Sequence, residues 1–157
     1  PALQRGVAPA AIAMCSNSAQ MAPLDGHAYV LALLAHDEAE AARVIDATDS
    51  PILAYMGSKH ALGRAVRRRA SAWGRAGVRL NAIAPGPVYT PLLEGDLADP
   101  VTGAAIRNLS VPLGRIGKPE EIAELAAFLL SPKASWIHGG VYYIDGGNDA
   151  EIRPDRF

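Results

Sequence analysis

The chain has 157 residues, 50% of them hydrophobic, and its 15 basic and 16 acidic residues leave a formal net charge of -1. This length suits one domain with a buried core, and the near-neutral charge argues against nucleic acid or an anionic membrane surface as a partner. The single cysteine, Cys15, excludes an internal disulfide framework and a Cys-based zinc site. No apolar run reaches the ~20 residues that a membrane span requires, and we expect a cytoplasmic protein.

The first half of the chain is expected to contain one buried strand followed by helices. Residues 10–15 form a short apolar run, which predicts a strand that delivers Ser16 to its carboxyl end. Residues 28–47 carry apolar side chains at three- and four-residue spacing between charged ones, which predicts one or two helices. A longer helix is predicted over residues 53–75, with Gly77 as its left-handed cap.

The second half is expected to contain two more strands around a helix. Residues 78–84 are rich in strand-forming side chains and are stopped by a Pro-Gly-Pro run. Interrupted, weakly helical stretches over residues 90–112 predict a mobile flap, and Pro119 opens a helix with acidic residues in its first turn. A short strand is predicted over residues 141–145, and the polar tail 148–157 is expected to lie on the surface or to reach a neighbouring subunit.

This order of elements predicts parallel strands joined by right-handed helical crossovers, which is an α/β layered fold. Three strands are few for such a fold, because a parallel sheet should be covered on both faces and the first strand would leave an open edge. No Gly-rich phosphate loop precedes these elements, and the chain begins at Pro1 rather than at Met. We therefore expect the carboxyl-terminal part of a longer protein.

Tyr55 and Lys59 form the most informative pair of side chains, because their four-residue spacing places them on one face of the long helix. A free tyrosine has a pKa near ~10, and a neighbouring cation favours its phenolate form. Together they can act as an acid/base pair near neutral pH. Such a pair is common by chance, and the ordinary alternative is a surface tyrosine beside a lysine.

The neighbours of this pair resemble the short-chain dehydrogenase/reductase family over nearly the whole chain. The matching motifs are, in chain order, Cys15-Ser16, Tyr55-Met-Gly-Ser-Lys59-His-Ala61-Leu62, Asn81-Ala-Ile-Ala-Pro85-Gly86-Pro87-Val88-Tyr89-Thr90, Gly117-Lys-Pro119-Glu120-Glu121 and Asp145-Gly146-Gly147. The resemblance implies the carboxyl-terminal part of a Rossmann-like doubly wound parallel sheet, with about three strands and covering helices. It also implies that the amino-terminal nucleotide-binding half is absent, which leaves residues 1–157 as a single partial domain.

The resemblance assigns catalytic roles to three residues and a cofactor, NAD or NADP. Tyr55 would be the general acid/base while hydride moves between a secondary alcohol or ketone and the nicotinamide. Lys59 would favour the phenolate and hold the nicotinamide ribose, and Ser16 would donate to the substrate oxygen, with Ser18 as a competitor for that role. The implied cofactor-binding residues are Tyr55, Lys59, Pro85, Gly86, Val88 and Thr90; for the last four an ordinary strand-to-loop exit is the alternative.

Ser16 and Tyr55 lie 39 residues apart, more than is usual in the family. The surplus, residues 26–49, is expected to be a helical insertion at the mouth of the site. Within the family such an insertion is similar to the bacterial 3α-hydroxysteroid dehydrogenase/carbonyl reductase group, and steroids or bulky ketones are the expected substrates. Because the insertion would obstruct association through the long helix, we expect a homodimer built on the last helix and strand.

Other interpretations remain open at this point. The chain could be a non-catalytic remnant or binding module without a cofactor site, or an epimerase or dehydratase that uses related chemistry. The run Arg67-Arg68-Arg69 points in three directions around a helix and favours a solvated face, with an NADP phosphate or a partner as alternatives. The four histidines lack metal-ligand spacing, and no metal site is expected.

Overall fold

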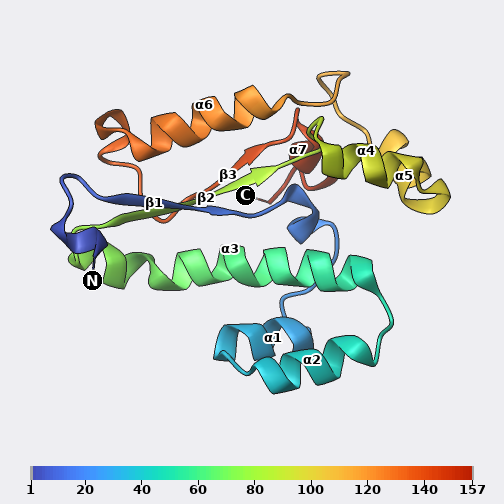
Figure 1. Ribbon diagram of the computed structural model, residues 1–157, viewed down its shortest axis with the longest axis horizontal. Helices are drawn as coiled ribbons and strands as arrows, with labels where there is room; N and C mark the ends of the chain where they lie inside the picture. Colours follow the sequence, from blue (N-terminus) through green and yellow to red (C-terminus); the bar gives the residue numbers. More distant parts are fainter. Residues whose placement is uncertain (1, 157) are drawn as a thin grey trace.

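The computed structural model describes residues 2–156, which fold around a parallel sheet with helices on both faces (Figure 1). The three strands are β1 (Ala10–Met14), β2 (Arg79–Pro85) and β3 (Val141–Ile144), in the spatial order β1-β2-β3. Central strand β2 contributes Ala82 and Ile83, which are fully buried. The predicted α/β fold with parallel strands is confirmed.

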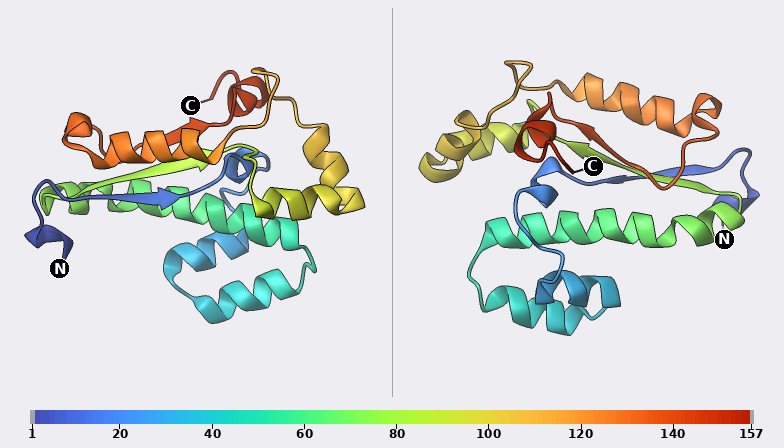
Figure 2. Two further views of the ribbon diagram at one scale, coloured as in Figure 1. Left: turned by 45° about the horizontal axis from the view of Figure 1, so that its top comes forward. Right: turned by 180° about the vertical axis from the view of Figure 1, so that it is seen from behind.

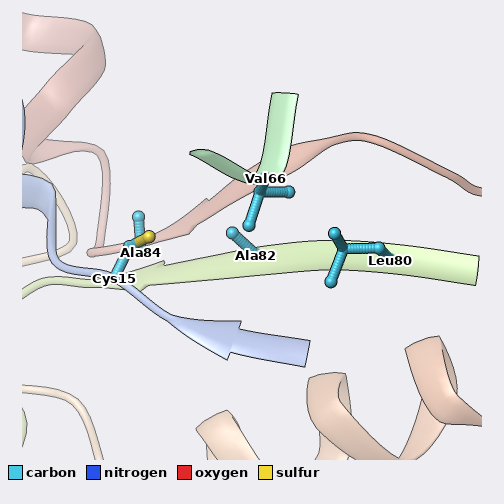
Figure 3. Packing of buried hydrophobic residues seen from close by; sticks show 5 residues of the cluster. All are labelled: Cys15, Val66, Leu80, Ala82 and Ala84. Atoms are coloured by element: carbon cyan, nitrogen blue, oxygen red, sulfur yellow. The ribbon is translucent and has the colours of Figure 1, made fainter. Parts of the chain in front are cut away.

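One face of the sheet is covered by the long helix α3 (Pro51–Arg75). A core of small and branched side chains lies between them, contributed by Cys15, Val66, Leu80, Ala82 and Ala84 (Figure 3). The helix begins two residues before the predicted start, because the Ser50 hydroxyl accepts the Leu53 amide hydrogen bond at 3.3 Å and proline occupies its first turn. Gly77, at φ 75°, is left-handed as predicted.

The opposite face is covered by α6 (Pro119–Leu130), which begins at the predicted proline. Glu121 in its first turn accepts a hydrogen bond from the Lys118 amide at 2.8 Å. At the other end, Arg79 of β2 donates to four carbonyl oxygens, those of Leu129, Leu130, Ser131 and Ala134. A guanidinium here satisfies the unpaired carbonyl groups of the helix terminus and favours its negative end.

Residues 28–47 form two helices, α1 (Ala28–Ala35) and α2 (Glu38–Asp46). Helix α1 packs against α3 on the side away from the sheet, and α2 packs against α1, as the views in Figure 1 and Figure 2 agree. A Cβ at Gly57 of α3 would lie 2.7 Å from the Tyr29 ring of α1, so the absent side chain at this position allows the close approach. The two helices therefore form an additional layer on the outer side of the long helix.

Residues 90–112 and the turn after β1 lie at the carboxyl ends of the strands, whereas the segments before β1 and after α6 lie at the opposite end (Figure 1, Figure 2). Residues 90–112 contain α4 (Pro91–Ala98) and α5 (Pro100–Arg107), and short 3-10 helices occur at η1 (Leu3–Arg5), η2 (Asn17–Gln20) and η3 (Pro132–Ala134). In the part of the chain that is described, no helix is both long and apolar enough to cross a membrane.

The tail corrects one expectation. Residues 148–152 form a helix, α7 (Asn148–Ile152), and its first two residues, Asn148 and Asp149, are buried rather than on the surface. The Asp145 carboxylate draws the turn inward, because it accepts hydrogen bonds from the amides of Gly147 at 3.0 Å and Asp149 at 2.7 Å. Phe157, the last residue of the predicted tail, lies outside the described residues.

Candidate active site

The candidate residues gather where the parallel strands end, which is the usual ligand-binding edge of such a sheet. Strand β1 leads through Cys15 to Ser16, and β2 ends at Pro85 and continues into Gly86. Tyr55 and Lys59 reach the same edge from the first part of α3. Segments distant in the sequence are thereby brought to one end of the molecule (Figure 1).

Tyr55 and Lys59 lie side by side on α3, as their spacing predicts. The Lys59 Nζ lies 5.7 Å from the centroid of the Tyr55 ring, within the range of a cation–π contact. The same ammonium donates a hydrogen bond to the Met14 carbonyl at the end of β1, at 3.0 Å. Since an ammonium carries three protons, this anchor leaves Lys59 able to donate further bonds while its position is held.

Ser16 is 8% exposed and lies at the turn between β1 and η2. Its Oγ accepts a hydrogen bond from the Ser18 amide at 3.2 Å and lies 2.9 Å from the Ser18 hydroxyl. If Ser18 donates in that second contact, both lone pairs of the Ser16 oxygen are used and its own proton is free for another acceptor. The two serines that compete for one role in the sequence therefore form a pair in the structure.

His60, the residue after Lys59, was missed as a site residue by sequence reasoning. Its side chain is buried; Nδ1 lies 2.8 Å from the carbonyl oxygen of Ala19 and Nε2 lies 3.2 Å from the Asp25 carboxylate. Because a carbonyl only accepts, Nδ1 must carry the proton in the first contact. Lys59 and His60 thus bind backbone oxygens on either side of Ser16, and no periodicity or motif in the sequence signals the second contact.

The loop after β2 is held against two other segments. A Cβ at Gly86 would lie 2.7 Å from the Asp145 Cα, so glycine is needed for this close approach. Val88 forms an isolated parallel bridge with Gly117. The Gly117 amide donates to the Pro87 carbonyl, and the Tyr89 amide donates to the Gly117 carbonyl. In that hydrogen-bond pattern the amide and carbonyl of Val88 itself point away from Gly117.

Thr90 ends the loop as the N-cap of α4, where its hydroxyl oxygen accepts a hydrogen bond from the Leu93 amide at 3.3 Å. The hydroxyl proton is not used in that bond. Asn81 has a structural role, because its buried side-chain amide donates to the Ile137 carbonyl at 3.0 Å and accepts from the Gly140 amide at 3.1 Å. It ties β2 to the segment that precedes β3.

A cavity of about 540 Å³ opens between α3, β3 and the turn after β1. Ser16 and Lys59 line this cavity, whereas Tyr55 and the four loop residues from Pro85 to Thr90 predicted to bind cofactor do not. The hydrogen bonds of the described residues do not join Tyr55, whose side chain is exposed, to Ser16. The structure therefore brings Lys59 into contact with the end of the strand that leads to Ser16. The Tyr55 side chain is exposed to solvent and does not line the cavity.

Two groups near the site have shifted acidity. Burial raises the pKa of the Cys15 thiol to about 11, against the opposing effect of the Lys59 charge. Burial also raises the pKa of Tyr143, and the neighbouring Asp149 carboxylate adds to the rise. Both side chains stay neutral at physiological pH, so Cys15 is a packed apolar residue rather than a nucleophile.

The residues present fit the nicotinamide end of a dinucleotide. Lys59 has protons to donate, and Val88 turns its backbone amide and carbonyl away from Gly117. A pyrophosphate usually needs a Gly-rich turn at a helix N-terminus, and the 157 residues contain no such motif. The fit is therefore limited to one half of the cofactor.

Comparisons with known proteins agree with these observations. Residues 8–149 match the family model described as Enoyl-(Acyl carrier protein) reductase. The chain is 47% identical to a 3-alpha-hydroxysteroid dehydrogenase/carbonyl reductase of Comamonas testosteroni, an alignment that covers 100% of this chain and 62% of the relative.

Solved structures extend the comparison. The crystal structure of a 3-alpha-hydroxysteroid dehydrogenase from Pseudomonas sp. B-0831, complexed with NADH, superposes with a TM-score of 0.95 at 46% identity, covering 99% of this chain and 61% of that one. A putative 2-deoxy-d-gluconate 3-dehydrogenase from Agrobacterium tumefaciens with bound NADP gives a TM-score of 0.67 at 27% identity, covering 94% and 49%. The chain thus spans about three fifths of the length of the first two relatives.

Proposed function

Because the chain belongs to the short-chain dehydrogenase/reductase family, we propose that it carries the proton-handling part of an NAD(P)-dependent oxidoreductase. The reaction is the interconversion of a secondary alcohol and a ketone. The observation that supports it most is the double contact of Lys59, whose ammonium lies over the Tyr55 ring and is anchored on the carbonyl of Met14.

In this proposal Tyr55 moves the proton. When an alcohol is oxidised, the phenolate oxygen of Tyr55 takes the hydroxyl proton, and in the reverse direction the phenol returns it to the carbonyl oxygen. The positive charge of Lys59 favours negative charge on the phenolic oxygen. Ser16 donates its hydroxyl proton as a hydrogen bond to the same substrate oxygen and holds it in place.

The bound cofactor would supply or accept the hydride at the substrate carbon. Lys59 would hold the nicotinamide ribose, and the loop of Pro85, Gly86, Val88 and Thr90 would lie against the nicotinamide. The backbone of Val88 offers one donor and one acceptor for the carboxamide, and the Thr90 hydroxyl proton could reach a phosphate. Both NADH and NADP occur in the related structures, and the choice between them stays open.

A hydroxysteroid or another bulky ketone is the proposed substrate. Support comes from the two relatives that are described as 3-alpha-hydroxysteroid dehydrogenases, at 47% and 46% identity. The added layer of α1 and α2 within residues 26–49 would border the mouth of the site, and residues 90–112, with α4 and α5, would close over the substrate. Activity is proposed to need the nucleotide-binding region that the longer relatives contain.

The test of this function is NAD(P)-dependent oxidation of a 3α-hydroxysteroid by the chain fused behind the amino-terminal region of its Comamonas relative, which the alignment leaves uncovered. Tyr55→Phe should lower turnover by roughly 10²–10⁴-fold, because it removes the group that transfers the proton. Tyr142→Phe makes the same chemical change in β3 outside the candidate site and should leave turnover unchanged.

Cofactor binding, followed by NADH fluorescence, separates the alternatives. Turnover that survives in Tyr55→Phe would contradict the proposed role of the tyrosine. No NAD(P) binding and no turnover would instead favour the binding module or remnant that lacks a cofactor site. A product other than the ketone would indicate an epimerase or dehydratase.

We further propose that the protein is a homodimer that associates through α6 and β3. Strand β3 pairs only with β2 among the described strands, so its outer edge is available. Apolar side chains are exposed beside it, with Phe128 and Leu130 on α6 and Trp136 in the following turn, the last at 98% exposure. Exposed apolar side chains at a free strand edge favour association.

A further inference from the structure

The cavity between α3 and β3 has a strongly basic wall that the proposed reaction does not use. Three arginines, Arg64, Arg67 and Arg68, line it from one side of α3. Arg67 and Arg68 lie three and four residues after Arg64, so each of them neighbours Arg64 on the helix surface. The third member of the arginine run, Arg69, points elsewhere and contacts His36 instead.

Other elements complete this wall. Arg153 reaches the cavity from the tail after α7, and the ammonium of Lys59 lies at the end nearest the candidate active site. The five cations thus come from α3 and from the tail, two segments that only the tertiary fold brings together. No aspartate or glutamate is among the described residues that line the cavity.

The charges of the helix arginines are not balanced by carboxylates. Arg64 donates to the backbone carbonyl of Asp25 at 2.6 Å, and Arg67 donates to the backbone carbonyl of Gly139 at 3.1 Å. These bonds orient the guanidinium groups without neutralising them. Among the five cations of this wall, Arg153 alone has an ion pair within the described part of the chain, with Asp149, and like charges on one helix face repel each other.

Besides these cations, the cavity is lined by the polar side chains of Ser16, Gln20 and His60 and by an apolar part. Val141 and Tyr143 of β3 form part of its lining, together with the neutral thiol of Cys15. Tyr143 is held in place because its hydroxyl accepts a hydrogen bond from Arg153 at 3.3 Å. A volume of about 540 Å³ lies within the ~300–1,000 Å³ of small-molecule sites and exceeds what an inorganic ion needs.

We propose that this cavity binds a small organic anion, in which a phosphate or carboxylate group contacts the α3 arginines and an apolar body lies on Val141 and Tyr143. Guanidinium groups present forked donors that match the oxygen pairs of both anions. The site adjoins the proposed substrate position, because Ser16 and Lys59 line the cavity, whereas Tyr55 does not and the α3 arginines have no part in the proposed reaction. The proposal does not depend on the oxidoreductase activity.

The test is binding of phenyl phosphate to the purified 157-residue chain, measured by isothermal titration calorimetry at low salt. Arg68→Ala should weaken binding about tenfold or more, because it removes a charged donor to the anion. Arg75→Ala removes the same charge from the same helix outside the cavity and should change the affinity little. Inorganic phosphate, benzoate and neutral phenol as separate ligands distinguish the anionic group from the apolar body.

The expected order is phenyl phosphate and benzoate above inorganic phosphate, with phenol weakest. Equal weakening by Arg68→Ala and Arg75→Ala would overturn the proposal, because the attraction would then come from the general charge of α3. Absence of phenyl phosphate binding by a folded chain would overturn it as well. Circular dichroism of each variant establishes that the chain is folded, and Arg64→Ala provides a second variant within the cavity.

Discussion

At the scale of single residues, two consecutive side chains on α3 position the turn that carries Ser16. Lys59 binds the Met14 carbonyl before that serine, and His60 binds the Ala19 carbonyl after it. The first contact involves a residue that its spacing from Tyr55 had already singled out. The second depends on a buried histidine whose environment is set by η2 and by Asp25, and the sequence alone offers no pattern for it.

His60→Leu should therefore destabilise the chain by about 1–3 kcal/mol, because leucine has no donor and leaves the buried Ala19 carbonyl unpaired. Urea unfolding measures the loss. His36→Asn is the control at an exposed histidine, since His36 adopts a left-handed conformation that asparagine tolerates. Equal stability of the two variants would show that the His60 contact does not hold the turn.

At the scale of elements, the residues that start and end a helix predicted helix boundaries well where they act on the neighbouring turn alone. The α6 start at proline and the left-handed Gly77 after α3 depend only on residues within the same turn. The helix α7 in the tail was not predicted, because it depends on the Asp145 turn and on the buried Asn148. The Asn148 side-chain amide donates to the Ser110 carbonyl and accepts from the Asn17 side chain. Those partners are far away in the sequence.

The loop after β2 leads to the next prediction. Gly86→Ala should destabilise the chain by roughly 1–3 kcal/mol, since its Cβ would lie 2.7 Å from the Asp145 backbone and force the loop or β3 to move. Gly95→Ala is the control, because nothing lies within 4 Å of its Cβ and alanine favours the α4 helix. Thermal unfolding of both variants tests this. An unchanged melting temperature for Gly86→Ala would contradict the close approach.

At the scale of the whole molecule, the sheet has two outer edges. Strand β1 pairs only with β2 among the described strands, and β3 likewise, so each edge has free backbone groups. The chain covers 62% of its Comamonas relative. The β1 edge is where further strands of a doubly wound sheet would add, and the β3 edge is the one proposed for dimer formation.

Leu130→Ser should shift the proposed dimer toward the monomer, because it removes an exposed apolar contact from α6. Leu92→Ser makes the same change on α4, where the side chain is 70% exposed, and should leave the dimer intact. Sedimentation equilibrium of both variants and of the parent chain provides the measurement. A tetramer built on α3 would contradict the proposed interface.

The sequence by itself determined the fold class, the order of the main elements and the Tyr55 and Lys59 pair, because these depend on periodicity and spacing along one chain. The same residues also identified the family, through motifs in a fixed order. Only the tertiary structure placed Ser16 between two anchored carbonyl groups and gathered the α3 arginines, Arg153 and β3 around one cavity. Such contacts join segments that are far apart in the sequence, and their partners are determined by packing rather than by any local pattern.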